Sequence, residues 1–438
     1  MQLFSKLTKT EMASVLNGSH ELFSFSNRKI KFVRNLTSQQ VFKKEALYHA
    51  NNFRSVPVAV AKGKGIHVWD VDGKHYIDFF SGFATLNMGH CHPRILKTFV
   101  EQAATLHHTS RGTHNNNLCE FAEHVTKLTG YDKVLAMNTG VEGGETSVKL
   151  ARRWGYMVKK IPENEAIIVF AKGNFWGRTL AAISTSSESV MYKDFGPYMT
   201  GFKVIEYNNI TALKEVLENN PNVAAFMVEP IQGEAGAVVP DEGYLCEVRR
   251  LCTKHNVLWI ADEVQTGLGR TGKLLACDYE NVKPDILILG KALSGGFYPV
   301  SAILANKPVM DCFTLGSHGS TFGGNPLGAK VSITALQVLQ EEGMIENAVK
   351  MGERLRTELR KALDTETVPI IRGKGLLCAI GINKEMGTWE LCSKFAENGL
   401  ITRPCSETII RLAPALIITP AEMDESVEII VKSIKSLC

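Results

Sequence analysis

The feature that most constrains the fold of this 438-residue chain is a series of short apolar runs, two of which end in functional charges. Residues 257–261 are followed by Asp262 and Glu263, and residues 286–290 are followed by Lys291. Apolar runs of this length are typical of buried strands. The carboxyl ends of parallel strands form the ligand-binding edge of an open α/β sheet. The sequence therefore predicts an acid and a lysine at that edge.

Strand-like runs and helical stretches alternate between about residues 86 and 335. The strand candidates are residues 134–137, 167–170, 224–229, 258–262, 286–289 and 300–304. Helices are expected in the gaps, for example over residues 143–158 and 244–255. Such alternation predicts an α/β fold with a mostly parallel sheet covered by helices on both faces. We expect residues 86–335 to form a large domain.

The segments on either side of this region have different patterns. Residues 37–85 predict a short helix and a hairpin, with strands at 65–70 and 76–79 joined by Asp72-Gly73, and we expect this segment to pack with a small C-terminal domain. Asn325-Pro326 predicts the start of a long helix that ends near Glu342. Residues 336–438 then predict that smaller α+β domain. Its strand candidates are 376–382 and 409–413, and its last helix opens with the capping box of Thr419 and Glu422.

Composition excludes several classes of protein. The chain is 45% hydrophobic and 21% charged, with a net charge of +4 that is dispersed along the sequence. No basic stripe interleaved with aromatic residues points to nucleic-acid binding. No apolar stretch reaches the roughly 18 residues that span a membrane. The ten cysteines form no CxxC pair, which favours reduced thiols in an intracellular compartment.

A local cluster, His90-Cys91-His92, has the residue types of a metal site but not the spacing. Gly89 and Pro93 on either side of it indicate a turn that leads into a helix. We therefore expect no bound metal there.

The first 36 residues differ in composition from the rest of the chain. They hold six lysines and arginines against only Glu11 and Glu21, with many serines and threonines. This composition is typical of a mitochondrial transit peptide. The alternative is a disordered or strand-exchanging N-terminal arm. We expect a mitochondrial matrix protein, with the cytoplasm as the alternative.

Lys291 and Asp262 together have the chemistry of one class of enzyme. A lysine held away from water can lose its proton and attack a carbonyl carbon. A nearby carboxylate can hold a proton on a ring nitrogen. An enzyme that uses pyridoxal 5′-phosphate requires both groups.

Two further segments lie between a predicted strand and the residues that follow it. Residues 138–145 are rich in glycine and open a helix, whose free N–H groups and dipole can bind a phosphate; the GxGxxG pattern of a dinucleotide site is absent. Phe175, Trp176 and Arg178 follow residues 167–170. An aromatic side chain there can lie on a conjugated ring, and an arginine can bind a carboxylate. The alternative is that both aromatic residues belong to the core and that Arg178 is solvated.

From about residue 37 to its end, the chain resembles the class III aminotransferases, and within that family the ornithine δ-aminotransferases. The segments that carry the resemblance are NTGVEGGE, GNFWGRT, MVEPIQGEAG, IADEVQTGLGRTG, LGKALSGG and HGSTFGGNPLG. The resemblance implies a fold-type I pyridoxal-phosphate transferase. Its large domain would contain a mostly parallel seven-stranded sheet.

The resemblance also implies a role for each matching residue. Lys291 would carry the cofactor covalently and transfer the proton of the reaction, while Asp262 would keep the ring nitrogen protonated. Thr321 would complete the phosphate site of the neighbouring subunit, which makes a homodimer the smallest active unit. The other expected cofactor contacts are the phosphate-binding N–H groups of Gly140 and Val141, the stacking ring of Phe175, and Gln265 beside the ring hydroxyl.

The substrate residues follow from the same resemblance. Arg411 would bind the α-carboxylate of 2-oxoglutarate, and Glu234 would neutralise Arg411 when the diamine is bound. Arg178 would hold the distal carboxylate. Phe53 and Phe83 stand where this family carries tyrosines, and loss of a hydrogen bond to a charged group weakens binding by roughly 1.5–3 kcal/mol. Arg54, which follows Phe53, is a candidate to compensate.

The activity that the resemblance implies is transfer of the δ-amino group of L-ornithine to 2-oxoglutarate. The products would be glutamate and glutamate 5-semialdehyde, which cyclises to pyrroline-5-carboxylate and links arginine and proline metabolism. One alternative is an ω-aminotransferase that acts on N-acetylornithine or 4-aminobutyrate. Another is a silent scaffold that binds the cofactor or a partner protein, although the intact Lys291, Asp262 and Gln265 argue against it.

Overall fold

The computed structural model describes residues 36–437. The expected leader over residues 1–36 therefore lies outside the described residues, except for Leu36. The chain divides into two units between Ala50 and Asn51. The described part of the first unit contains helix α2 (Ser38–Tyr48), whose N-cap Thr37 forms a capping box with Gln40. The short helix predicted after residue 37 is confirmed.

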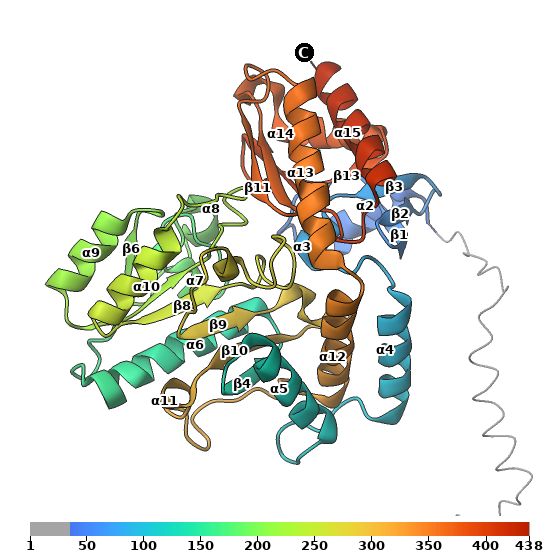
Figure 1. Ribbon diagram of the computed structural model, residues 1–438. Coiled ribbons are helices and arrows are strands. Elements are labelled where there is room, and N and C mark those ends of the chain that lie inside the picture. The colour runs from blue at the N-terminus through green and yellow to red at the C-terminus, as the bar shows by residue number, and fades with distance from the viewer. Residues whose placement is uncertain (1–35, 438) are drawn as a thin grey trace, which may run out of the picture. The chain divides into compact units, whose positions relative to one another are not determined.

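The second unit is built on a seven-stranded sheet with the strand order β4-β10-β9-β8-β7-β5-β6 (Figure 1). Strand β10 is antiparallel to both of its neighbours, and all the other pairs are parallel. The mostly parallel seven-stranded sheet is therefore confirmed. Its strands are β4 (Lys133–Met137), β5 (Ile167–Ala171), β6 (Phe202–Ile205), β7 (Val223–Val228), β8 (Leu258–Asp262), β9 (Ile286–Leu289) and β10 (Ser301–Ala305).

Six of these strands coincide with the predicted runs to within one residue at each end, but β6 was not predicted. Strand β6 lies at the edge of the sheet, and both Lys203 and Val204 in it are exposed. A half-exposed edge strand of four residues carries no continuous apolar run. The periodicity that marks buried strands is therefore missing from it.

Helices cover both faces of the sheet, as predicted. In β5, Ile168 and Phe170 pack on the side of α6 (Gly140–Trp154), whereas Val169 and Ala171 pack on the side of α9 (Ile210–Asn219) and α10 (Tyr244–Lys254). Successive side chains of a strand point to opposite faces, which explains this division. At the other end of the sheet, β9 and β10 pack against α5 (Asn116–Thr129) and α12 (Pro326–Glu341) (Figure 1). The predicted helix at 143–158 begins at Gly140 and ends in a π-helical turn (Gly155–Lys159).

Two smaller sheets flank the large one. The first has the order β1-β2-β3-β13 and contains the predicted hairpin, with β2 and β3 antiparallel. The second has the order β11-β12-β14. Strand β11, which was not predicted, contains a glycine and two basic residues, so it lacks a continuous apolar run. The strands are β1 (Val60–Lys64), β2 (His67–Asp70), β3 (His75–Asp78), β11 (Ile370–Lys374), β12 (Leu377–Gly381), β13 (Leu400–Ile401) and β14 (Ile409–Leu412).

The remaining helices connect or cover these sheets. Asn325 caps α12 and Thr419 forms the capping box of α15, as predicted. The domain boundaries at residues 36, 85 and 335 stay predictions. No helix within residues 36–437 has the length and apolar character needed to cross a membrane. The other helices are α3 (Ser81–Ala84), α4 (Pro93–Thr105), α7 (Leu180–Ile183), α8 (Ser189–Tyr192), α11 (Lys307–Met310), α13 (Met344–Ala362), α14 (Thr388–Glu397) and α15 (Pro420–Lys435).

A buried arginine joins the loop after β8 to distant parts of the second unit. Arg270 is fully buried. Its guanidinium donates hydrogen bonds to the side-chain oxygen of Asn87, to the carbonyl of Leu376 at 3.0 Å and to the carbonyl of Pro414 at 2.5 Å. Burial lowers the pKa of Arg270 to about 9, with a smaller contribution from the positive charge of Arg411. Neutral acceptors therefore hold this cation at the junction of three chain segments.

Replacing Arg270 with methionine is expected to lower the free energy of unfolding by at least about 3 kcal/mol, because three buried acceptors lose their donor. Urea unfolding of the purified protein measures this change. The matched control is Arg250→Met, since Arg250 is exposed and, among residues 36–437, its one ion pair is with Glu247 one turn away on α10. The control should stay within about 0.5 kcal/mol of the wild type. Equal losses in the two variants would contradict the role given to Arg270.

Candidate active site

A cavity of about 220 Å³ lies where several strands of the large sheet end. The residues that line it come from the segments that follow β4, β5, β7, β8 and β9. The carboxyl ends of these strands therefore meet at one site, as expected for an open α/β sheet. The lining residues are Gly140, Val141, Phe175, Trp176, Gly177, Glu229, Glu234, Asp262, Val264, Gln265 and Lys291.

Lys291 begins a short 3-10 turn directly after β9 and Gly290. Its backbone has a φ of 45°, in the left-handed region, which costs a non-glycine residue on the order of 1–3 kcal/mol. The amine is recessed in the cavity, and burial lowers its pKa from 10.5 to about 8. Glu234 raises this pKa and Arg411 lowers it, each by less than the effect of burial. The site thus holds an amine that loses its proton more readily than a solvated lysine.

Two buried carboxyl groups share the cavity with this amine. Burial raises the pKa of Asp262, at the end of β8, to about 6, against the opposing effects of the Val264 N–H and of Lys291. Burial likewise raises the pKa of Glu229 to about 8, and the charge of Asp262 adds to the shift. Glu229 accepts hydrogen bonds from the backbone N–H groups of Phe175 at 3.0 Å and Gly233 at 3.1 Å. It therefore fixes two of the loops that line the cavity.

The amino end of α6 supplies unpaired donors. The N-cap Thr139 accepts from the N–H of Glu142, and the Glu142 carboxylate accepts from the N–H of Thr139 at 2.7 Å. Within residues 36–437, the N–H groups of Gly140 and Val141 have no hydrogen-bond acceptor. Such groups, together with the helix dipole, form an anion site. A Cβ on Gly143 would lie 2.7 Å from Ile288, so this glycine lets the helix approach the sheet closely.

In the aromatic segment after β5, one residue belongs to the hydrophobic core and another lines the cavity. Trp176 belongs to the core: it stacks on Phe170 with ring centroids 5.5 Å apart, and its indole N–H donates to Thr185. Phe175 is only partly buried and lines the cavity. Arg178 is exposed, with its guanidinium 5.8 Å from the ring centroid of Phe53.

Glu234, Arg411 and Gln265 form one hydrogen-bonded group beside the cavity. Arg411 donates to the Glu234 carboxylate at 2.6 Å and to the Gln265 side-chain oxygen at 3.2 Å. The Gln265 amide donates in turn to Glu234 at 3.3 Å. Burial opposes ionisation of Glu234, but Arg411, Lys291 and these hydrogen bonds lower its pKa to about 2. Sequence alone did not predict that Gln265 contacts Arg411.

Phe83 reaches this group from a strained segment of backbone. Ser81, Gly82, Phe83 and Ala84 all have φ between 47° and 63°, a left-handed turn that is costly for the three residues with a Cβ. Asp78 stabilises its start by accepting the N–H groups of residues 80 and 81, both at 2.8 Å. The Phe83 ring meets the Phe53 ring edge to face with centroids 5.9 Å apart.

Thr321 and Arg54, like Phe53, Phe83, Arg178 and Arg411, are not among the residues that line the cavity. Thr321 is exposed, on the loop before α12. Arg54 faces the Trp389 ring, with its guanidinium 4.4 Å from the centroid. The predicted compensation of Phe53 by Arg54 therefore has no support in this geometry.

Several residues near the cavity were not assigned a role from sequence. Glu229 is the last residue of the strand candidate 224–229, and that position was its only signal. Gly177 and Val264 line the cavity without any distinguishing pattern. Arg403 lies over both Phe53 and Phe83, hundreds of residues away in sequence, so no local motif could reveal it.

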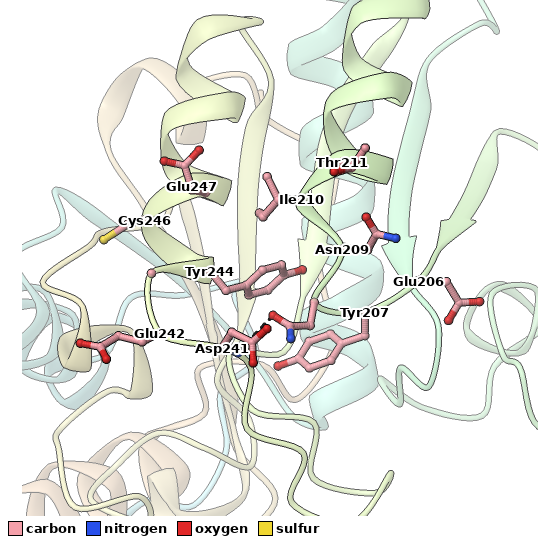
Figure 2. A pocket seen from close by; sticks show the side chains of 12 residues that line it. Glu206, Tyr207, Asn209, Ile210, Thr211, Asp241, Glu242, Tyr244, Cys246 and Glu247 are labelled. Carbon is pink, nitrogen blue, oxygen red and sulfur yellow. Dashed lines mark hydrogen bonds between the residues drawn. The ribbon is translucent and has the colours of Figure 1, made fainter.

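Two other features, a second cavity and the His90-Cys91-His92 segment, lack the groups that this site combines. A larger cavity of about 630 Å³ opens at the first turns of α9 and α10, where Figure 2 shows Tyr207 and Tyr244 among several carboxylates. Its described lining offers no lysine or arginine. In the segment weighed as a metal site, His90 pairs with Asp78 at 2.8 Å and His92 with Glu342 at 3.2 Å, contacts that suit a structural turn.

The residues present fit pyridoxal 5′-phosphate. One cavity combines a recessed amine, a buried carboxyl group, a partly buried aromatic ring and a helix end with two free N–H groups. These groups match an aldehyde, a ring nitrogen, a ring face and a phosphate, respectively. Lys291, Asp262, Phe175, Gly140 and Val141 are therefore the residues that would hold the cofactor.

Replacing Asp262 with asparagine is expected to stabilise the cofactor-free protein at pH 7.5. The raised pKa means that the folded state keeps a proton which the unfolded chain releases near pH 4, so the stability of the wild type falls between about pH 4 and 6. Asparagine does not ionise, so the variant should not show the loss in free energy of unfolding that Asp262 causes, which is on the order of 2–3 kcal/mol. Urea unfolding at pH 4 and 7.5 measures it, and identical pH dependence in both proteins would contradict it.

Comparison with known proteins places the chain in a family. The model of the family Aminotransferase class-III matches residues 48–434. The chain is 60% identical over 400 residues to the mitochondrial ornithine aminotransferase of Drosophila ananassae, covering 91% of this chain and 92% of that one. The solved ornithine aminotransferase of Toxoplasma gondii, in which PLP partly occupies the active site, gives a TM-score of 0.90 at 41% identity, covering 99% of each chain.

An acetylornithine aminotransferase from Elizabethkingia anophelis gives a TM-score of 0.84 at 48% identity, covering 92% of this chain and all of that one. The match to the family model extends over most of the chain and includes each strand of the large sheet. The chain belongs to the class III aminotransferases, enzymes that depend on pyridoxal 5′-phosphate.

Proposed function

We propose that this chain transfers the δ-amino group of L-ornithine to 2-oxoglutarate and forms glutamate 5-semialdehyde and glutamate. The observation that carries the proposal is the ion pair of Arg411 with Glu234 beside the recessed amine of Lys291. In this pair, Arg411 can bind an α-carboxylate, and Glu234 neutralises Arg411 when no such carboxylate is bound. The relatives named as ornithine aminotransferases support the choice of substrate.

The bound cofactor would supply an aldehyde that condenses with amines and a ring that accepts electrons from the neighbouring carbon. The free N–H groups of Gly140 and Val141 would bind its phosphate. The ionised Asp262 carboxylate would accept a hydrogen bond from the protonated ring nitrogen and so keep it protonated. Phe175 would cover one ring face, and Glu229 holds the Phe175 backbone in place.

Lys291 serves as nucleophile and as proton carrier. With a pKa of about 8, roughly one tenth of the amine is neutral at pH 7, far more than in a solvated lysine. The neutral Nζ removes a proton from the δ-carbon of ornithine and later delivers one to the α-carbon of the product glutamate. Its position at a strand end, on a strained backbone, fixes the direction in which the amine points.

Glu234 and Arg411 let one site accept two unlike substrates. While the pair is closed, the positive charge of Arg411 is neutralised and the extended chain of ornithine can enter with its δ-amine first. When 2-oxoglutarate binds, its α-carboxylate replaces Glu234 on the guanidinium. An arginine that is almost completely buried strongly favours having one carboxylate or the other.

The rival substrates are N-acetylornithine and 4-aminobutyrate, the first of which appears in the names of two related structures. Initial rates of the holoenzyme with these amines and with ornithine test the proposal. Ornithine should give the highest kcat/KM, and a clear preference for N-acetylornithine would overturn the assignment. Lys291→Ala is the control, expected to lose at least about a thousandfold in kcat because it removes both nucleophile and proton carrier.

Glu234→Gln is expected to shift the preference from ornithine toward L-glutamate as amino donor. The substitution keeps a hydrogen-bonding group but removes the charge that neutralises Arg411. The ratio of kcat/KM for ornithine to that for glutamate should fall by about ten- to a hundredfold, as for loss of a charged contact. An unchanged ratio, with both rates lowered equally, would contradict the proposed switching of Arg411.

We also propose a homodimer in which Thr321 completes the phosphate site of the neighbouring subunit. The exposure of Thr321 and its absence from the cavity lining of its own chain support this arrangement. Sedimentation of the holoenzyme tests the dimer. A Thr321→Val variant with undiminished cofactor affinity would argue against the shared site.

For localisation we propose the mitochondrial matrix. The basic, serine-rich first 36 residues and the word mitochondrial in the names of several relatives support it. Microscopy of tagged proteins with and without residues 1–36 tests the proposal. Cytosolic signal from both proteins would refute it.

A further inference from the structure

Three arginines lie near the rings of Phe53 and Phe83. The guanidinium of Arg403 lies 4.9 Å from the ring centroid of Phe53 and 5.1 Å from that of Phe83. Arg178 lies 5.8 Å from the Phe53 ring, and Arg411 lies 5.7 Å from the Phe83 ring. Three positively charged guanidinium groups therefore lie next to these two rings, at one side of the candidate active site.

Only one of the three arginines has an acid partner. Arg411 pairs with Glu234. Within residues 36–437, Arg178 and Arg403 have no carboxylate within 4.0 Å. The Nε atom of Arg403 is buried and has no hydrogen-bond acceptor in the described chain. A guanidinium that is half removed from water and left without an acceptor is costly, unless a ligand supplies the missing anion.

The backbone holds Arg403 beside the strand that carries Arg411. The hydroxyl of Thr402 donates to the carbonyl of Arg411 at 2.5 Å, and Pro404 forms a bridge with Ile410. The N–H of Cys405 donates to the carbonyl of Ile409 at 2.8 Å. Residues 402–405 are therefore fixed to β14, and the position of Arg403 follows from that pairing.

The charges around Arg403 favour the binding of an anion next to its guanidinium. Burial lowers the pKa of Arg403, and the positive charges of Arg411 and Arg178 act in the same direction, against Glu234. The closed Arg411–Glu234 pair neutralises one positive charge and leaves two. The phenylalanine rings attract the guanidinium through their faces but offer it no hydrogen-bond acceptor.

We propose that Arg403, together with Arg178, binds the substrate carboxylate that is farthest from the reacting amine. This inference rests on the proposed function, in which that group is the α-carboxylate of ornithine. Arg403 is thereby a specificity-determining residue. It supplies a charged contact to that carboxylate from beside Phe53 and Phe83, whose rings carry no hydroxyl group.

The test compares three amines on the holoenzymes of wild type and Arg403→Gln. 5-Aminopentanoate is ornithine without the α-amino group, and 1,4-diaminobutane is ornithine without the carboxylate. Arg403→Gln is expected to lose about ten- to a hundredfold in kcat/KM with ornithine and 5-aminopentanoate, mainly through KM. Its kcat/KM with 1,4-diaminobutane should change less than about twofold, because that amine has no carboxylate to lose.

The matched control is Arg54→Gln. The guanidinium of Arg54 lies on the Trp389 ring, as that of Arg403 does at 5.7 Å, but among residues 36–437 it does not lie over the ring of Phe53 or Phe83. The control should keep the wild-type preference for carboxylate-bearing amines. Equal losses with all three amines in Arg403→Gln would mean that Arg403 only supports the rings, and would overturn the inference.

A second variant guards against a folding defect. If Arg403→Gln does not retain the cofactor, Arg403→Lys keeps the charge but loses the planar pair of donors. Its kcat/KM for ornithine should fall about three- to tenfold relative to that for 1,4-diaminobutane, and an unchanged ratio would overturn the inference. If wild type converts 5-aminopentanoate but not ornithine, the proposed function fails, while the comparison of 5-aminopentanoate with 1,4-diaminobutane still decides the role of Arg403.

Discussion

Everything at this site depends on keeping ionisable side chains close together in a recess that excludes most water. Charges interact more strongly there than in solution. The pKa shifts show which charges the protein alone stabilises: Glu234 stays ionised beside Arg411, whereas burial favours the neutral forms of Lys291, Asp262 and Glu229. A ligand with a protonated ring nitrogen gives Asp262 the partner that it needs to ionise. The positive charge of the cofactor ring would thus balance the negative charge of Asp262 at the end of β8.

The residues proposed for the site divide into a cofactor layer, with Lys291 and Asp262, and a substrate layer, with Arg411 and Arg403, and the two layers have different structural origins. Lys291 and Asp262 follow adjacent strands of the large sheet, so their spacing is set by backbone pairing. Arg411 and Arg403 belong instead to the C-terminal segment, and the buried Arg270 ties that segment to the loop after β8. Substitutions in the substrate layer can therefore change which carboxylate is bound without disturbing the strands that hold the cofactor.

The strand-end positions of Asp262 and Lys291 could be predicted from sequence because their signals are local. Apolar runs ending in Asp262 and Lys291 carry both the strand and its functional charge within a few residues. The edge strand β6 and the strand β11 lack such runs and were not found. Pairs such as Glu234 with Arg411, 177 residues apart, have no local signal, so only the family resemblance suggested them. The contact of Gln265 with Arg411 required the structure itself.

The phenylalanines at positions 53 and 83 illustrate why the substrate layer resists prediction. From sequence, these two phenylalanines indicate only that two hydroxyl groups are missing and that a charged substrate is bound more weakly. In the fold their ring faces instead hold Arg403 without giving its N–H groups an acceptor. Because the rings offer no acceptor, the proposed carboxylate is the group that would complete the hydrogen bonding of Arg403. On that proposal, the missing hydroxyl groups and the arginine without an acceptor are two parts of one change in how the carboxylate is bound.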